Sequence, residues 1–368
     1  AQESTTDLSM ASSTSNGQKN VIVAGAGLAG SMATLVLARR GHKVHLLEAR
    51  PEFREILRVE SGAKPTIPTG THGALTDAAK RSINLALSVR GLAALQTVGL
   101  AEKALENSVP MRGRMIHKLD GSTELQPYGV YGECIYSISR GMLNSWLLEA
   151  SDELELVDRS FGVKILAVDE NGTVTANTPD GQKKFESDFV VGADGAFSKV
   201  RDALGRLTRL NFNRRYIRHG YKELCIPPTS DGEFALEPNA LHIWPRHEFM
   251  MIALPNCDKS FTVTLFAPFE ESVGCFNSLT TRELVAEHFN TYFADAMPLM
   301  PTLLSVPRNH TAPYHTIPHY PHTTVTLLHH TTRAECCVVW FCVCVARESV
   351  VCVLCYLTSY TVACGVAE

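Results

Sequence analysis

Residues 20–48 read NVIVAGAGLAGSMATLVLARRGHKVHLLE, and this stretch decides the fold. It opens with a short apolar, β-branched run at 20–24, which predicts a buried strand. Residues 31–40 then show helical spacing and stop at Gly41, and residues 43–47 form a second apolar run. A strand, a Gly-rich turn, a helix and a second strand in this order predict a βαβ unit that binds a dinucleotide.

Each glycine of the turn has a separate role in this interpretation. Gly25 allows the tight turn, Gly27 lets the backbone approach a pyrophosphate, and Gly30 lets the helix pack closely on the strand. Glu48, eighteen residues after Gly30, is positioned to accept hydrogen bonds from a ribose hydroxyl. An acid at this position favours FAD or NAD over NADP. A Gly-rich turn that arose by chance is the alternative.

The next part of the chain favours FAD over NAD. Residues 51–80 are rich in Pro, Gly and Thr and resemble a loop, so the βα alternation stops after two strands. A flavoprotein instead completes its sheet from distant parts of the chain. A later apolar strand, 187–192, runs into Ala193-Asp194-Gly195 and a helix, which places a carboxylate near a ligand. The alternative there is an ordinary turn in which Asp194 caps the helix.

Composition limits the class of protein. A length of 368 residues predicts about two domains. Apolar content of 45%, charged content of 20% and a net charge of −4 without a basic stripe are typical of a globular protein that does not bind nucleic acid. Four scattered cysteines before residue 300 indicate reduced intracellular thiols. Residues 1–19 are polar, lack the pattern of a signal peptide and are expected to be disordered.

Three features together resemble the class A flavin monooxygenases, which are aromatic hydroxylases of the p-hydroxybenzoate hydroxylase type. They are the βαβ start, the 187–195 segment and Ile138-Ser139-Arg140 between them. The resemblance implies an α/β fold, a Rossmann-like FAD-binding domain with an interleaved antiparallel-sheet substrate domain. It also implies that Arg140 contacts FAD and that the Asp194 turn lies near the flavin and the NADPH path.

Longer stretches narrow the resemblance to the kynurenine 3-monooxygenase family, from residue 20 to about 305. They are RSINLALSVR (81–90), MRGRMIH (111–117), QPYG (126–129), HGYKEL (219–224), LHIWPR (241–246) and FMMIALPNCDKSFTVTLF (249–266). The family resemblance implies hydroxylation of L-kynurenine to 3-hydroxykynurenine with bound FAD and with NADPH and O₂ as co-substrates. It also implies a place in tryptophan degradation and a C-terminal anchor at the mitochondrial outer membrane.

Two residues match the family's substrate contacts. Arg114 would pair with the amino-acid carboxylate through its guanidinium fork, and Tyr128 would add a phenolic hydrogen bond. A solvated surface Arg and a half-buried turn Tyr are the alternatives, although Arg112 and Arg114 alternate with Met111 and Met115, which turns one Arg inward. No catalytic acid or base is implied, because the chemistry belongs to the cofactor. On the FAD side the matching positions, beyond the glycines and Asp194, are Ala29, Leu47, Glu48, Ala49, Arg50, Ala86, Arg140 and Val163.

The resemblance fades near Pro307. The family continues with a Gly-Asp-Ala-Ala-His motif and a Gly-rich loop around the flavin ring, but this chain has no Gly-Asp and no glycine between Gly274 and Gly365. We therefore expect a truncated fold in which the parallel sheet has a bare apolar edge. A catalytically incomplete FAD-binding fragment is one alternative function, and another FAD-dependent phenol hydroxylase is a second.

Residues 309–368 are expected to be a low-complexity, non-native tail. A His- and Thr-rich block is followed by a Cys- and Val-rich block, and neither has a helical or strand period. A zinc site at spacings such as His319/His322 and Cys352/Cys355, and a membrane span over 349–367, are the alternatives. Before the tail we expect an FAD-binding domain at 20–117 and 135–205 and a substrate domain at 118–134 and 206–300.

Overall fold

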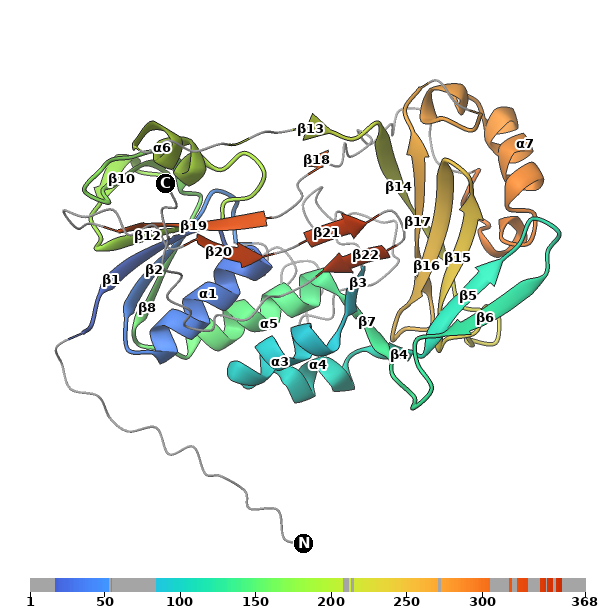
Figure 1. The fold of residues 1–368 in the computed structure, drawn as a ribbon, viewed down its shortest axis with the longest axis horizontal. Coiled ribbons are helices and arrows are strands. Elements are labelled where there is room, and N and C mark those ends of the chain that lie inside the picture. The colour runs from blue at the N-terminus through green and yellow to red at the C-terminus, as the bar shows by residue number, and fades with distance from the viewer. Residues whose placement is uncertain are drawn as a thin grey trace, which may run out of the picture.

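The computed structural model describes residues 17–52, 54, 84–207, 212, 215–270 and 273–304, and the backbone of five short strands between 318 and 352. The predicted disordered segment 1–16 and most of the predicted loop 51–80 lie outside the described residues. Two large sheets stand apart in the molecule, and each has helices packed against it (Figure 1).

The first sheet has a parallel centre drawn from distant parts of the chain, as predicted. Its order there is β12-β1-β2-β8, in which β1 is Asn20–Ala24, β2 Lys43–Glu48, β8 Val157–Phe161 and β12 Phe189–Gly192. Alternate residues of β1 enter different cores, since Val21 and Val23 belong to one buried cluster and Ile22 and Ala24 to another. Both faces are therefore covered, which is why these strands are continuously apolar.

Helices α1 (Leu28–Arg39) and α5 (Arg140–Asp152) pack together on one face of this sheet. The other face is covered by α6 (Lys199–Leu207) and an antiparallel sheet of β9, β10 and β11, which are Lys164–Val168, Val174–Thr178 and Gly181–Phe185. Helices α3 (Val89–Thr97) and α4 (Ala101–Glu106) extend the first core. A three-stranded sheet, β3-β7-β4, leads toward the second domain and contains Asn84–Leu87, Ile135–Ser139 and Val109–Met111.

The second sheet has the order β14-β17-β16-β15-β5-β6. Its strands are His219–Ile226, Phe261–Pro268, Phe249–Pro255, Ala240–Arg246, Gly113–His117 and Thr123–Pro127. Only the β15–β5 pair among them is parallel. Helix α7 (Arg282–Tyr292) and the short 3₁₀ turns Phe276–Ser278 and Met297–Leu299 cover one face over a core that contains Trp244 and Phe261.

Strand β5, which the sequence analysis assigned to the FAD-binding domain, pairs with β15 of the second sheet. His117 at the end of β5 stacks on buried Trp244 at 4.0 Å. Asn84 of β3 joins the domains through its side-chain Nδ2, which donates to Asn256 Oδ1 at 2.5 Å and to Ser137 Oγ at 3.0 Å.

The edge of the parallel sheet is paired, which corrects the expectation of a bare edge. Strand β19 (Thr323–His329) runs antiparallel beside β12, and β20 (Val338–Phe341) follows beside β19. An open strand edge has unpaired backbone N–H and C=O groups, and a β-branched segment such as TTVTLLH can pair with them as an added strand. The same region was expected to have no strand period, yet it also contributes β18, β21 and β22, which are Pro318–His319, Val343–Ala346 and Ser349–Cys352.

The rest of the predicted tail, including Cys355 and Cys364, lies outside the described residues. None of the helices within the described ranges is long and apolar enough to cross a membrane. Within the same ranges no group of three His, Cys, Asp or Glu side chains is arranged to hold a metal ion.

Candidate functional site

The Gly-rich turn separates into two packing glycines and one open glycine. Gly25 has a φ of +99°, and a Cβ added there would lie 2.5 Å from the carbonyl oxygen of Ala193. A Cβ on Gly30 would lie only 1.7 Å from the carbonyl oxygen of Gly25. A Cβ on Gly27 would meet no atom within 4 Å. Gly25 and Gly30 are thus required by the protein's own packing, whereas Gly27 borders open space where a ligand can approach the backbone.

The start of α1 faces this open space. Gly27 is its N-cap residue, and no side chain among the described residues caps the helix. The first helical backbone bond runs from Ser31 N–H to Gly27 O at 2.9 Å, which leaves the amides of the first turn, including that of half-buried Ala29, for a ligand. Such amides and the helix dipole favour a phosphate group. The turn therefore fits the pyrophosphate of a dinucleotide.

Glu48 is buried beside the turn, with 7% of its surface exposed. Its Oε2 accepts the Ala26 N–H at 2.7 Å, and its Oε1 accepts the backbone N–H and Nε of Arg50 at 2.9 and 2.8 Å. Burial alone would raise the pKa of Glu48, but the hydrogen bonds from Arg50 and Ala26 lower it overall. The predicted ribose contact thus requires the solvent-exposed Arg50 side chain to move aside, while the Ala26 bond can stay. Ala49 is exposed at the same strand end.

The Asp-Gly turn meets the Gly-rich turn at the carboxyl ends of β1 and β12. Ala193 N–H donates to Ala24 O at 2.8 Å, so the two turns are in direct contact. Asp194 itself caps α6, since its Oδ2 accepts the Lys199 N–H at 2.6 Å and its Oδ1 accepts Ser198 Oγ at 2.5 Å. The carboxylate of Asp194 therefore caps the helix, as in the alternative interpretation of this turn. The backbone of the turn borders the Gly-rich turn.

Arg140 begins α5 and is exposed, one helical turn before Asn144. Asn144 Nδ2 donates to Ala26 O in the Gly-rich turn at 3.1 Å. Residues four apart lie on the same side of a helix, so Arg140 faces the same region. Sequence reasoning missed Asn144, although its i,i+4 spacing from Arg140 was a usable signal.

Three of the predicted cofactor positions present mainly backbone. Leu47 is 1% exposed and Val163 3% exposed, and both side chains lie in the core beneath β1. The Val163 N–H donates to Glu48 O at 2.8 Å, which places Val163 at the same strand end as Glu48. Ala86 is half-buried on β3, opposite Ser137. A cofactor contact at Leu47 or Val163 would have to use the main chain.

The two predicted substrate residues come together on the second sheet. The Arg114 guanidinium carbon lies 5.6 Å from the centre of the Tyr128 ring, and the two side chains also share a hydrogen bond. Burial raises the pKa of Tyr128, and the neighbouring Arg114 opposes that shift. Tyr128 follows β6, where its N–H donates to Arg112 O at 3.0 Å. The backbone pairing of β5 with β6 therefore determines that these side chains meet.

Arg114 lies on the face of the sheet that α7 does not cover. In Figure 1, α7 packs on the side away from the dinucleotide domain, so the opposite face is turned toward that domain. Half-buried apolar side chains line the opposite face, namely Leu241, Ile243, Met250, Ile252 and Phe266. A flat apolar surface with a cation at one margin fits an aromatic amino acid.

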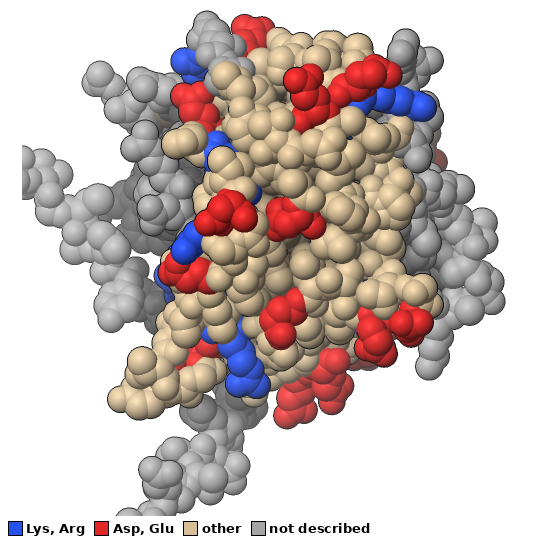
Figure 2. Space-filling model, turned by 90° about the vertical axis from the view of Figure 1, so that its right-hand side faces the viewer, with Lys and Arg blue, Asp and Glu red and all other residues tan. Residues whose placement is uncertain are grey.

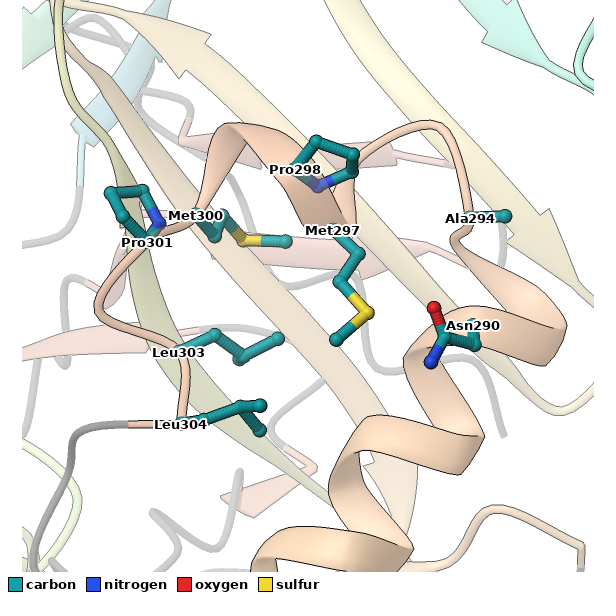
Figure 3. Close-up of a pocket in the computed structure, with 8 residues that line it drawn as sticks. All are labelled: Asn290, Ala294, Met297, Pro298, Met300, Pro301, Leu303 and Leu304. Atoms are coloured by element: carbon teal, nitrogen blue, oxygen red, sulfur yellow. The ribbon is translucent and has the colours of Figure 1, made fainter.

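The α7 side of the second domain contains a cavity that no charged or titratable side chain lines. Figure 2 shows acidic side chains scattered over a largely uncharged face on which they predominate over Lys and Arg, so this face does not suit nucleic acid. An apolar cavity of about 390 Å³ lies between the end of α7 and the residues that follow it, as Figure 3 shows. It is lined by Asn290, Ala294, Met297, Pro298, Met300, Pro301, Leu303 and Leu304, and none of these side chains is charged or titratable.

Comparison with known proteins agrees with this geometry. Two family models, each described as an FAD binding domain, match residues 75–231 and 20–64. The kynurenine 3-monooxygenase of Dictyostelium discoideum is 41% identical over 287 residues, which cover 78% of this chain and 57% of that protein. The enzyme of Sus scrofa is 42% identical over 284 residues, or 76% of this chain and 55% of its own. The chain is similar in sequence to the kynurenine 3-monooxygenases over about three quarters of its length, at 78% and 76%.

The chain spans a little over half the length of these relatives, at 57% and 55%. Among solved structures, 2-methyl-3-hydroxypyridine-5-carboxylic acid oxygenase matches with a TM-score of 0.59 and 21% identity, over 79% of this chain and 68% of the other. That likeness confirms the predicted α/β fold.

Proposed function

We propose that the chain hydroxylates L-kynurenine to 3-hydroxykynurenine, with FAD bound and with NADPH and O₂ as co-substrates. The observation that carries this proposal is the Arg114–Tyr128 pair, which stands on the sheet face turned toward the dinucleotide domain. Arginine recognises a carboxylate through two parallel hydrogen bonds, and the phenol beside it can donate another. The names of the curated relatives support kynurenine as the substrate.

The residues present fit FAD. Open space beside Gly27, first-turn amides without a side-chain cap and the buried Glu48 carboxylate match the pyrophosphate and ribose of an adenine dinucleotide. When bound, FAD would supply the redox chemistry that links NADPH oxidation to oxygen insertion. Arg140 and the backbone at Ala86 and at 47–50 would hold its remaining parts.

The protein's own contribution is binding and orientation. Arg114 and Tyr128 would fix the amino-acid end of the substrate, and the apolar face that holds Ile252 and Leu241 would position the aromatic ring and exclude water. The carboxylate of Glu48 would hold the ribose, and Ala26 N–H keeps that carboxylate oriented.

The test is flavin binding followed by turnover. The purified chain is titrated with FAD by fluorescence quenching, and NADPH oxidation is then measured with and without L-kynurenine while 3-hydroxykynurenine is quantified by chromatography. Arg114→Ala is the matched variant. It should abolish the kynurenine-dependent part of NADPH oxidation and leave FAD binding intact. FAD binding without kynurenine-dependent turnover would favour the incomplete-fragment alternative, which the absence of any Gly-Asp motif in the sequence also supports.

The resemblance extends this proposal to tryptophan degradation at the cytosolic face of the mitochondrial outer membrane. Fractionation of cells that produce the chain tests that location directly.

A further inference from the structure

Glu223, in β14, is a half-buried acid that the proposed function has not used. Its Oε1 is enclosed and has no hydrogen-bond partner among the described residues. Burial raises the pKa of Glu223 to about 7, and the nearby Lys222 opposes that shift only in part. A buried carboxyl oxygen without a donor is costly to the folded state, so it points to a partner that is missing.

The strand registers determine which face Glu223 occupies. They align Glu223 with Thr264, Thr264 with Ile252, Ile252 with Ile243 and Ile243 with Ile116 across five strands. Paired residues of neighbouring strands point to the same side of a sheet. Ile226 of β14 packs in the core beneath α7, and Glu223 lies three positions before it, an odd separation that places Glu223 on the opposite face.

Arg114 lies two residues before Ile116, so it shares this face with Glu223. The two residues stand at opposite margins, since β17, β16 and β15 lie between their strands. Four inter-strand spacings put their backbones about 19 Å apart, and both side chains can shorten that span toward the centre. Between them lies the apolar row of Ile252 and Ile243.

We propose that Glu223 is a further substrate-binding residue, which accepts a hydrogen bond from the aromatic amine on the ring of the substrate. This inference rests on the proposed function. The polarity of the face matches kynurenine, because a cation at one margin suits its carboxylate and an acceptor at the other suits its ring amine. A hydrogen bond from the amine to a carboxylate also raises the electron density of the ring, which favours oxygen insertion beside the amine.

The test compares two ligands on the full chain. Equilibrium dialysis measures the Kd of L-kynurenine and of 2-amino-4-oxo-4-phenylbutanoate, which lacks the ring amine, for the wild type and for Glu223→Met. The substitution keeps the length of the side chain but removes both acceptor oxygens. Glu124→Met is the control, because Glu124 is exposed on the same face and at the opposite margin from Glu223. Thermal unfolding checks that each variant is folded. If Glu223→Met does not fold, Glu223→Gln takes its place in the comparison.

We expect Glu223→Met to weaken kynurenine binding by about ten- to hundredfold, as for loss of a hydrogen bond to a charged group, and to leave binding of the analogue unchanged. Glu223→Gln should show a smaller loss and Glu124→Met none. An unchanged kynurenine-to-analogue ratio in Glu223→Met, with Arg114→Ala still impaired, would overturn the role of Glu223 and leave the proposed function standing. A wild-type chain that binds neither ligand would overturn both.

Discussion

Two glycines of one turn should respond to the same substitution in opposite ways. In Gly30→Ala the new Cβ would lie 1.7 Å from Gly25 O and 3.3 Å from Ala193 Cβ, so the helix must move away from the strand. In Gly27→Ala the new Cβ meets no atom within 4 Å, and the backbone at φ −76° and ψ 178° suits any residue.

The magnitudes follow from these distances. Overpacking costs about 1–3 kcal/mol and outweighs the roughly 0.5–1 kcal/mol that Ala gains over Gly in a helix, so Gly30→Ala should lose about 1–2 kcal/mol. For a domain of this size that lowers Tm by about 2–8 °C. Gly27→Ala should shift Tm by under about 2 °C, because only an N-cap preference changes. It should nevertheless weaken FAD binding more than about tenfold, since its Cβ occupies the space of the pyrophosphate.

The assay is thermal unfolding by circular dichroism without ligand, followed by FAD titration of each variant. The reasoning fails if Gly27→Ala destabilises the chain as much as Gly30→Ala. It fails equally if Gly27→Ala binds FAD like the wild type, because the open space would then not be the cofactor site.

Three further predictions follow from the two domains and their junction. Asn84→Ala leaves Ser137 Oγ without its donor and leaves Asn256 Oδ1 with only the long bond from Thr262 Oγ1 at 3.4 Å. The loss should cost about 1–3 kcal/mol in urea unfolding, and a cost below about 0.5 kcal/mol would contradict the role of this junction. Burial lowers the pKa of His242 from its usual value of 6.5 to about 4. The neutral His242 side chain therefore contributes its full stability above pH 6.5, and that stability is lost as the pH falls toward 4. His242→Gln should therefore remove about 2 kcal/mol of the difference in unfolding free energy between pH 7 and pH 5, and an unchanged difference would rule this out. Arg114→Lys should weaken kynurenine binding at least about tenfold in dialysis and leave FAD binding unchanged, because an ammonium group lacks the planar fork, and equal affinity would show that the guanidinium does not bind the carboxylate.

Separate roles for the three glycines could be predicted from the sequence. Their spacing assigned Gly25 to the tight turn, Gly30 to close packing of the helix and Gly27 to the approach of a ligand. The φ of +99° at Gly25 and the 1.7 Å Cβ distance at Gly30 fit the first two roles, and the ligand role of Gly27 stays a prediction. This works because the βαβ unit is local, so its geometry depends on residues that are close in the chain. The sequence also singled out Arg114 and Tyr128, since both belong to short, specific motifs, and the structure brings their side chains together. Their role in binding substrate stays a prediction.

Other features depended on segments far apart in the sequence. The carboxylate of Asp194 accepts hydrogen bonds from the start of α6, and the side chains of Leu47 and Val163 are buried in the core. A sequence motif does not show in which direction these side chains point. Strand β5 pairs with β15, which lies more than a hundred residues later in the chain. The pairing of β12 with β19 likewise came from a region whose composition showed no period.

By itself, then, the sequence determined the dinucleotide turn, the order of its strands and the residues that match a substrate carboxylate site. Only the tertiary structure decided that Glu48 is already held by Arg50 and that Asn144 supports the turn. It also decided that Glu223 shares a face with Arg114. The physical reason is that a local motif needs only the chain's short-range geometry, whereas burial and the direction of a side chain are set by strand registers between distant segments.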